Sequence, residues 1–330
     1  MAFASTPRAA RLLALLAHLA LLALLALTGC AAPPAPRPFT APLPPFAEGG
    51  RFAVVGDLQR TSLLEFWRES NDAERPLIVG ALAAERPAFL AITGDLVFDG
   101  SSDGKWADFD ALMAPVRDAG IPVVGALGNH EYWGGRAGEA KFFARLPLLE
   151  GRRWYTLAWG PLRLVVLDSN LGALPPADGE AQRRWYADTL TALDGDPAVR
   201  GVLVMMHHPP YTNSTVTGDE AQVQRDFVPA FLAARKTLAM MCGHVHSYER
   251  FARQGKAFVV SGGGGGPRAP LYTGADRRHP DDLYPGPALR DFNFVVITVE
   301  AGGLAGEVRG LKKGGRAFST MDRFFLPFAE

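Results

Sequence analysis

The chain has 330 residues, of which 48% are hydrophobic, and its 34 basic and 34 acidic residues give a net charge of zero. This length allows one large domain or two, and the hydrophobic content is ample for a buried core. The balanced charge argues against a nucleic-acid-binding surface, so no nucleic-acid partner is expected.

The N-terminal residues have the pattern of a secretory signal peptide. Arg8 and Arg11 precede an apolar stretch from Leu12 to Leu27, and small residues follow it. The alternative is a transmembrane anchor, but this stretch is shorter than the ~20 residues needed to span a bilayer. We therefore expect a signal peptide at residues 1–29.

The end of this segment, Leu27-Thr28-Gly29-Cys30, resembles the lipobox of bacterial lipoproteins. This resemblance implies that Cys30 becomes the acylated first residue, inserted in a lipid bilayer. The protein would then lie in the bacterial cell envelope, facing the periplasm or the exterior. The remaining cysteine, Cys242, is left without a partner, so no disulfide is expected.

Residues 30–50 are rich in proline and alanine. Such a composition favours an extended, semi-rigid linker that would hold the following domain away from the membrane.

From residue 51 onward, apolar runs alternate with helical patterns. The pattern predicts strands that end in polar clusters at 52–55, 88–93, 121–127, 201–206 and 237–241, and further strands at 162–167, 257–261, 293–300 and 304–311. Helices are predicted at 71–85, 106–119 and 180–193. The stretches 132–138 and 267–290 are predicted to be surface loops beside the active site.

Five short polar clusters follow the first group of strands: Gly56-Asp57-Leu58-Gln59, Gly94-Asp95, Gly128-Asn129-His130-Glu131, His207-His208-Pro209-Pro210 and Gly243-His244-Val245-His246. Strand ends in an α/β sheet bring sequence-distant residues to one edge. Together these clusters offer enough oxygen and imidazole donors to hold two metal ions. The sequence therefore predicts a dinuclear metal centre.

The order of these clusters resembles the calcineurin-like metallophosphoesterases, whose motifs run D-x-H, G-D, G-N-H-[DE], H and G-H-x-H. The resemblance covers residues 51 to about 250 and is nearest to the purple acid phosphatase-like branch, because Gly243-His244-Val245-His246 continues as Ser247-Tyr248-Glu249-Arg250. It implies an α/β fold, a four-layer α/β/β/α sandwich of two mixed sheets flanked by helices. Residues 51–330 would form this metallophosphoesterase domain.

The resemblance also implies a ligand set. Asp95 would bridge the two metal ions; Asp57, Gln59 and His246 would complete one site, and Asn129, His207 and His244 the other. A mixture of imidazole and oxygen ligands suits manganese, zinc or iron.

Two positions depart from the family pattern. Gln59 stands where the family has histidine, and its neutral amide oxygen is a weaker ligand toward zinc or iron. Phe98 stands where the purple branch has tyrosine, three residues after Asp95. Without that phenolate the protein should not be purple.

Several polar residues within or near the clusters stand outside the implied ligand set. By the family pattern His130 would act as general acid, because an imidazole can carry a proton near neutral pH, and Glu131 could orient its ring. His208 was expected to point away from the metals if residues 207–208 are extended. Asp168 was expected to cap a turn, and Arg268 was a candidate contact for a substrate oxyanion.

The leading functional hypothesis is hydrolysis of phosphate monoesters by a metal-bridged hydroxide. Two alternatives stay open. One is phosphodiester hydrolysis, and the other is a metal-binding envelope lipoprotein with little or no turnover, which the substitution at Gln59 would favour. The run from Ser261 to Gly266 lacks the Lys-Ser/Thr of a Walker loop, so it predicts a tight turn close to the metal site.

Overall fold

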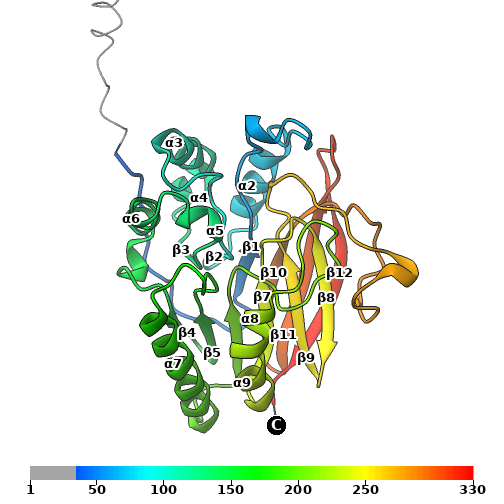
Figure 1. The fold of residues 1–330 in the computed structure, drawn as a ribbon. Coiled ribbons are helices and arrows are strands. Elements are labelled where there is room, and N and C mark those ends of the chain that lie inside the picture. Colours follow the sequence, from blue (N-terminus) through cyan, green and yellow to red (C-terminus); the bar gives the residue numbers. More distant parts are fainter. Residues whose placement is uncertain (1–34, 330) are drawn as a thin grey trace, which may run out of the picture. The chain divides into compact units, whose positions relative to one another are not determined.

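Two six-stranded mixed sheets are formed by residues 35–329, the part of the chain that the computed structural model describes (Figure 1). The expected signal peptide at 1–29 and the acylation site Cys30 lie outside these residues. Within the described residues, no helix is long and apolar enough to cross a membrane.

The first sheet has the strand order β12-β11-β10-β1-β2-β3. The pairs β1–β2 and β2–β3 are parallel, while β1–β10, β10–β11 and β11–β12 are antiparallel. Its strands are β1 (Arg51–Val55), β2 (Leu90–Ile92), β3 (Val123–Gly125), β10 (Phe292–Glu300), β11 (Gly303–Leu311) and β12 (Phe318–Pro327).

The second sheet has the order β4-β5-β6-β7-β9-β8. Its four central strands, β5, β6, β7 and β9, are parallel. The edge strands β4 and β8 pair antiparallel with β5 and β9. Its strands are β4 (Tyr155–Trp159), β5 (Leu162–Val166), β6 (Gly201–Met205), β7 (Thr237–Cys242), β8 (Tyr248–Arg253) and β9 (Lys256–Ser261).

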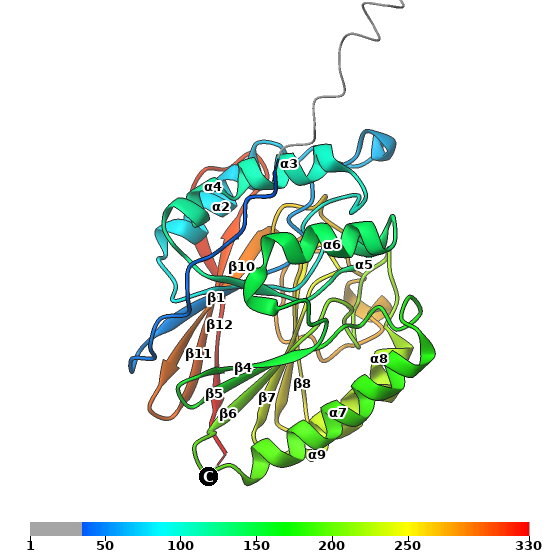
Figure 2. The same cartoon turned by 90° about the vertical axis from the view of Figure 1, so that its left-hand side faces the viewer.

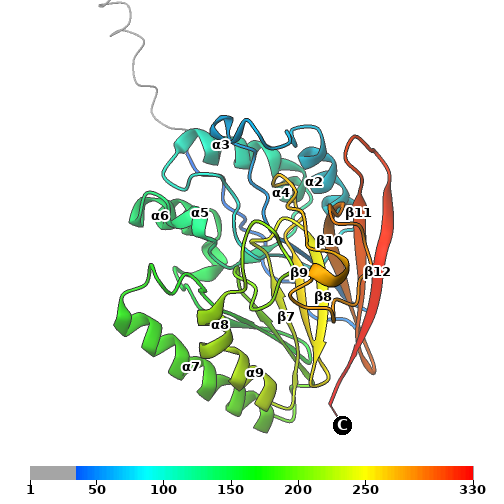
Figure 3. The same ribbon diagram turned by 45° about the vertical axis from the view of Figure 1, so that its right-hand side comes forward.

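Helices cover the outer faces of both sheets, as Figures 2 and 3 show. Those packed with the first sheet are α2 (Glu74–Ala84), α3 (Asp103–Leu112) and α4 (Ala114–Asp118); those packed with the second are α7 (Pro176–Gly195), α8 (Ala221–Asp226) and α9 (Val228–Ala233). Two shorter connections carry α5 (Asn129–Tyr132) and α6 (Arg136–Arg145). The predicted four-layer α/β/β/α sandwich is therefore confirmed.

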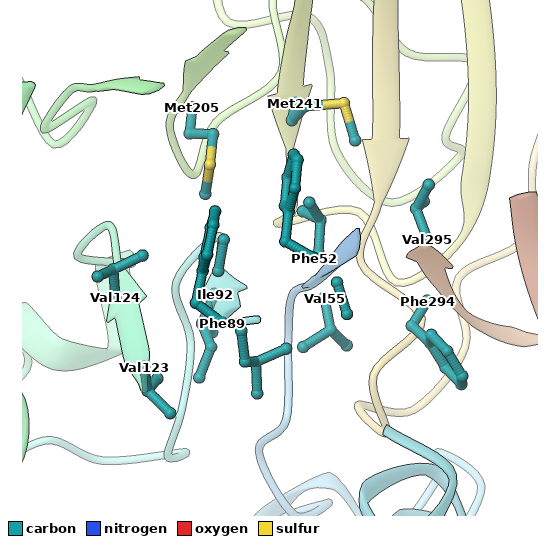
Figure 4. Packing of buried hydrophobic residues seen from close by; sticks show 14 of the residues in the cluster. Phe52, Val55, Phe89, Ile92, Val123, Val124, Met205, Met241, Phe294 and Val295 are labelled. Atoms are coloured by element: carbon teal, nitrogen blue, oxygen red, sulfur yellow. The ribbon is translucent and has the colours of Figure 1, made fainter. Parts of the chain in front are cut away.

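The alternation of side chains along each strand creates two apolar layers. On β6, Leu203 and Met205 belong to the core shared by the two sheets, whereas Val202 and Val204 pack under α7 and α9. Figure 4 shows Met205 and Met241 of the second sheet pointing toward Phe52 and other side chains of the first. Strands buried on both faces read as continuous apolar runs, which is why the sequence revealed them.

Three strands and four helices (α5, α6, α8 and α9) were not predicted, and one predicted helix is divided in two. β4, β8 and β12 were not predicted; the last two carry polar and charged side chains among their apolar ones, and β12 is an edge strand. The stretch 132–138, expected to be a loop, instead contains the end of α5 and the first turn of α6. The region predicted as one helix at 106–119 is divided between α3 and α4, which meet at Met113 before Pro115.

The segment expected to be a free linker packs against the domain from Arg37 onward. Phe39 is buried and its N–H donates to Arg145 O at 2.8 Å, while Phe46 meets the Trp159 ring edge-on. The segment has no helix or strand, as its prolines predict. Its aromatic side chains nevertheless give residues 37–47 a place on the surface of the domain, so this part is not a spacer.

Candidate metal centre

The side chains of the five clusters converge where β1, β2, β3, β6 and β7 end. Asp57, Asp95 and His244 each have a positive φ, of 62°, 56° and 68° respectively. This left-handed conformation is unusual for residues other than glycine and is typical of functional sites where the surroundings enforce it. Each strand end thus turns sharply and directs its polar side chain into the same space.

One group of four ligand atoms surrounds a point beside Asp95. His207 Nε2 lies 3.3 Å from Asp95 Oδ2 and 3.0 Å from Asn129 Oδ1. His244 Nδ1 lies 3.0 Å from the same Asn129 oxygen and 3.1 Å from His207 Nε2. These are the residues that the sequence assigned to one metal site together with the bridging aspartate.

A second group lies on the other side of Asp95. Gln59 Nε2 is 3.4 Å from Asp95 Oδ2 and 3.0 Å from His246 Nε2, which is in turn 3.4 Å from Asp57 Oδ1. All four side chains are buried. Asp95 Oδ2 is therefore the atom that both groups share.

The spacing of these atoms fits the coordination shells of metal ions. Ligand atoms about 2.1 Å from an ion are about 3.0 Å apart in an octahedral shell and about 3.4 Å apart in a tetrahedral one. The measured separations of 3.0 to 3.4 Å fall in this interval. The donor set of carboxylate, amide and imidazole also matches manganese, zinc or iron.

Backbone carbonyl groups orient two of the histidines. His207 Nδ1 is 2.8 Å from Thr93 O, and His246 Nδ1 is 2.8 Å from Pro267 O. Because a carbonyl can only accept, each Nδ1 carries a proton, and in the neutral ring, the form that binds a cation, each Nε2 presents a lone pair to the site. Such outer hydrogen bonds are typical of metal-binding histidines.

Glycine is required where the backbone passes the carboxylates. A Cβ on Gly128 would lie 2.1 Å from Asp95 Oδ1, and one on Gly262 would lie 2.5 Å from Asp57 Oδ2. The predicted tight turn at the glycine-rich run is thus confirmed, because its backbone approaches the site too closely for any side chain.

The electrostatics of this site demand positive charge. Burial alone would raise the pKa of Asp95, but the neighbouring His207 holds it well below its ordinary range. Burial lowers the pKa of His207, yet Asp95 and Asp57 together raise it to about 9. A protonated His207 therefore compensates the carboxylate in the protein alone, which is the role that a bound cation would fill.

Glu131 does not orient the His130 ring, contrary to the expectation. Its carboxylate accepts backbone N–H groups from Gly128 at 2.8 Å, Asp95 at 3.0 Å and Leu96 at 2.8 Å. Burial and the nearby Asp95 raise the pKa of Glu131 to about 7. Glu131 instead fixes the turn that carries the shared carboxylate.

The His130 ring is held from the other side. Its Nδ1 faces the carbonyl oxygen of Phe98, and its Nε2 lies 3.6 Å from Asp95 Oδ2. Trp133 packs against the ring with centroids 4.0 Å apart. The Nε2 atom is thus presented to the centre of the site.

The expectation for His208 needs a correction. Residues 207–208 form a bend after β6, so their side chains do not alternate as in a strand. The His208 ring lies beside that of His244, with centroids 4.5 Å apart, and its Nδ1 is 2.9 Å from Ser169 Oγ. Burial and the neighbouring His207 lower the pKa of His208 to about 3.

Asp168 and Arg268 lie outside the ligand groups. Asp168 Oδ1 accepts the N–H of Asn170 at 3.0 Å, which confirms its predicted role in a turn. The Arg268 guanidinium is paired with both carboxylate oxygens of Glu69, at 2.8 and 2.9 Å. Arg268 is held by Glu69 and is not among the residues that line the hollow over the ligand groups, so it is a poor candidate for binding a substrate oxyanion.

A hollow of about 130 Å³ opens over the ligand groups, and Asp95, His130 and His246 form its floor. Val216 and Ala269 line its walls together with Arg68, whose guanidinium also donates to Glu65 and to Pro267 O. Arg68 was not predicted, because it lies in a loop without a motif, nine residues after Gln59. No local pattern could have singled it out.

Comparison with known proteins agrees with this geometry. The sequence profile of the family described as calcineurin-like phosphoesterase matches residues 50–248. The chain belongs to this family.

Among its relatives, purple acid phosphatase 22 of Arabidopsis thaliana is 24% identical over 65% of this chain and 48% of its own length. A probable cyclic nucleotide phosphodiesterase of Rhodopseudomonas palustris is 27% identical over 51% of this chain and 61% of its own. The structure of a purple acid phosphatase from yellow lupin (Lupinus luteus) seeds aligns with a TM-score of 0.65 at 20% identity, covering 89% of this chain and 55% of that one. The chain spans about half the length of the purple acid phosphatases it matches.

Proposed function

We propose that this metal-dependent phosphoesterase hydrolyses phosphate monoesters at a centre of two metal ions, with manganese, zinc and iron as the candidates. The position of Asp95 Oδ2 between the two ligand groups carries this proposal. A carboxylate that is shared in this way can bind two cations at once. When bound, the ions supply Lewis acidity and lower the pKa of a water molecule.

The ligand assignment follows the two groups. Asp57, Gln59 and His246 would hold one ion and Asn129, His207 and His244 the other, with Asp95 between them. The fit rests on atom separations, on the carbonyl groups that free both Nε2 atoms, and on the electrostatic demand for a cation.

We assign His130 the transfer of a proton to the leaving oxygen. With Nδ1 facing the Phe98 carbonyl, a protonated ring directs its second N–H from Nε2 into the hollow. Arg68 would contact the phosphoryl oxygens at the rim, because it is the cationic side chain that lines this hollow beside the histidines.

Phosphodiester hydrolysis is the second candidate, and the relative from Rhodopseudomonas palustris favours it. Initial rates on p-nitrophenyl phosphate and bis-p-nitrophenyl phosphate, measured beside metal content, test both. A monoester rate at least tenfold above the diester rate supports the proposal. A filled site without turnover on either substrate would instead support a metal-binding lipoprotein with little or no activity.

His130→Ala tests the proton transfer. Esters with poor leaving groups should lose on the order of 10²–10⁴-fold in rate, because these need a proton in the transition state. Nitrophenyl esters should lose far less. An equal loss on both classes would mean that His130 positions phosphate instead.

We further propose that residues 1–29 are removed as a lipoprotein signal peptide and that acylated Cys30 holds the enzyme at the bacterial cell envelope, facing the periplasm or the exterior. The support is the order of basic residues, apolar stretch and Leu27-Thr28-Gly29-Cys30. Cys30→Ser should prevent acylation and move the protein to the soluble fraction or leave it unprocessed. Unchanged processing and membrane partition would contradict the proposal.

A further inference from the structure

An exposed turn between β1 and α2 presents four large hydrophobic side chains to solvent. Leu63 is 93% exposed, Leu64 77%, Phe66 85% and Trp67 71%. We call these four residues the apolar turn. Leu63 and Leu64 lie in the short 3-10 helix η1 (Leu63–Glu65), and Phe66 and Trp67 follow it directly. Isolated exposed hydrophobic residues are common, but a contiguous group of this size is typical of an interaction site.

Polar side chains of the same segment brace it internally, and one of them joins it to the rest of the domain. Ser62 Oγ accepts the N–H of Leu64 at 3.2 Å, and Glu65 Oε1 accepts Arg68 Nη1 at 2.9 Å. Arg68 Nη2 donates to Pro267 O at 2.6 Å. The segment is therefore joined to the domain through Arg68, while its large apolar side chains are exposed, the reverse of the usual arrangement.

The apolar turn lies at the end of the domain where the packed chain begins. In Figures 1–3 both η1 and the residues just after position 35 lie at the end marked by α3. Arg37 O accepts Arg117 Nη2 at 3.0 Å, and Phe39 is buried. The chain is thus attached to this end of the domain from Arg37 onward.

The short length of chain before this attachment point indicates what the apolar turn contacts. Cys30 lies seven positions before Arg37, so the two residues are at most about 25 Å apart. This step rests on the proposed acylation of Cys30. An acylated Cys30 would keep this end of the domain close to the bilayer, within reach of the apolar turn.

We propose that the apolar turn inserts into the surface of the lipid bilayer and acts as a second membrane contact beside the acylated Cys30. Apolar surface that enters the bilayer adds to membrane binding beside a lipid anchor. Charges near the turn are paired, Arg60 with Asp72 and Arg68 with Glu65. The contact therefore depends on apolar burial, not on attraction to anionic lipids. Because Arg68 follows the turn directly and lines the hollow, the mouth of the site lies near the bilayer surface.

The proposal is tested with the processed protein, which begins at Cys30, bound to phosphatidylcholine vesicles with and without bromine on the acyl chains. Bromine quenches tryptophan fluorescence only on close approach. Wild-type protein should lose part of its emission in brominated vesicles, and Trp67→Phe should remove that loss. Trp133→Phe, which changes another partly exposed tryptophan, should retain it.

The strength of the contact is tested by transfer between vesicles. In a Cys30→Ser chain, which lacks the lipid anchor, Leu64→Ser combined with Phe66→Ser should speed transfer by roughly tenfold or more, since less apolar surface is inserted. High salt and the addition of phosphatidylglycerol should change the transfer rate of the Cys30→Ser chain little. Hydrolysis of p-nitrophenyl phosphate should be unchanged by the two substitutions, which separates this proposal from that of the enzymatic function.

Several outcomes would overturn the proposal. Equal quenching in wild type and Trp67→Phe would show that Trp67 does not enter the bilayer. A dimer in sedimentation that Leu64→Ser and Phe66→Ser convert to a monomer would assign the turn to a second copy of the chain. Mass spectrometry reports the state of Cys30 separately: an unacylated chain that still shows quenching of Trp67 supports the turn and refutes the anchor, and no quenching in either form refutes the turn.

Discussion

The N–H of Asp95 donates to Oε2 of Glu131 at 3.0 Å, although the two residues are 36 positions apart in the sequence. The same carboxylate accepts the N–H groups of Leu96 and Gly128. Asp95 has a φ of 56°, a left-handed conformation that is uncommon outside glycine. Glu131 thus ties the β2 and β3 strand ends together and sets the direction of the Asp95 side chain.

Replacement of Glu131 by glutamine should weaken both the fold and the metal site. An amide has one acceptor oxygen, so its NH₂ group would oppose at least one backbone N–H donor. We expect a loss of about 1–3 kcal/mol in the free energy of unfolding, measured by urea denaturation, together with weaker metal binding. Glu180→Gln, on the exposed face of α7, is the control and should change neither quantity. Unchanged metal affinity in Glu131→Gln would contradict the positioning role.

Asp95→Asn should abolish hydrolysis and reduce the bound metal. A neutral amide cannot bridge two cations as a carboxylate does. Metal analysis after gel filtration and the rate on p-nitrophenyl phosphate measure the two effects. Asp72→Asn, at a half-exposed ion pair with Arg60, controls for loss of a carboxylate elsewhere. Near-normal turnover in Asp95→Asn would remove Asp95 from the bridging position.

Arg68→Ala should raise KM for phosphate esters by roughly tenfold with a smaller change in kcat, because the lost contact is made to the phosphoryl oxygens before and during the reaction. Arg60→Ala provides the comparison, since Arg60 pairs with Asp72 and does not line the hollow over the ligand groups. Steady-state kinetics on a monoester measure both variants. If the two substitutions have the same effect on KM, Arg68 does not contact substrate.

Stability should depend on pH through Glu249, which is buried and binds the loop that contains Thr212 and Asn213. Burial raises the pKa of Glu249 from its ordinary 4.5 to about 7. The unfolded chain therefore loses this proton as pH rises through 4.5, while the folded protein keeps it until about pH 7. Between these values the free energy of unfolding should fall by up to roughly 3 kcal/mol because of this group.

Glu249→Gln removes that dependence while keeping a side chain that can accept the Asn213 N–H and donate to Thr212 Oγ1. Urea denaturation of both proteins at pH 5, 6, 7 and 8, with a chelator to exclude metal effects, measures the difference. The free energy of unfolding of the variant should rise relative to that of wild type as the pH rises. Parallel curves for the two proteins would show that Glu249 does not titrate in this range.

Local sequence patterns predicted the parts of this molecule that depend on local physics. Buried strands such as β6 are continuous apolar runs, and the polar clusters after them lie at strand ends that the sheets bring together. The roles of Arg68 and of Glu131, which accepts backbone N–H groups, could not be found in this way, because the partners of both side chains depend on how distant segments pack. Phe39 shows the same limit: its proline-rich neighbours predict an extended chain but not the groove in which its ring is buried.

Gln59 is the proposed ligand position at which this chain departs from the family pattern. Its Nε2 lies 3.0 Å from His246 Nε2 and 3.4 Å from Asp95 Oδ2, whereas its Oε1 is buried without a hydrogen-bond partner among the described residues. A half-turn of the amide would place Oε1 beside His246 and Asp95, where a cation would attract it. Gln59 can therefore serve as a neutral oxygen ligand, but a weaker one than imidazole.

We expect the ion held by Asp57, Gln59 and His246 to be removed first by a chelator, so that activation by added metal has two phases. Gln59→His supplies an imidazole and should tighten this ion, raising the metal retained per chain and merging the two phases into one. Gln59→Leu, which fills a similar volume without a donor atom, should retain only the ion of the other group. Metal content after dialysis and titration calorimetry measure these effects independently of activity. Identical metal stoichiometry in wild type, Gln59→His and Gln59→Leu would show that this side chain does not bind metal.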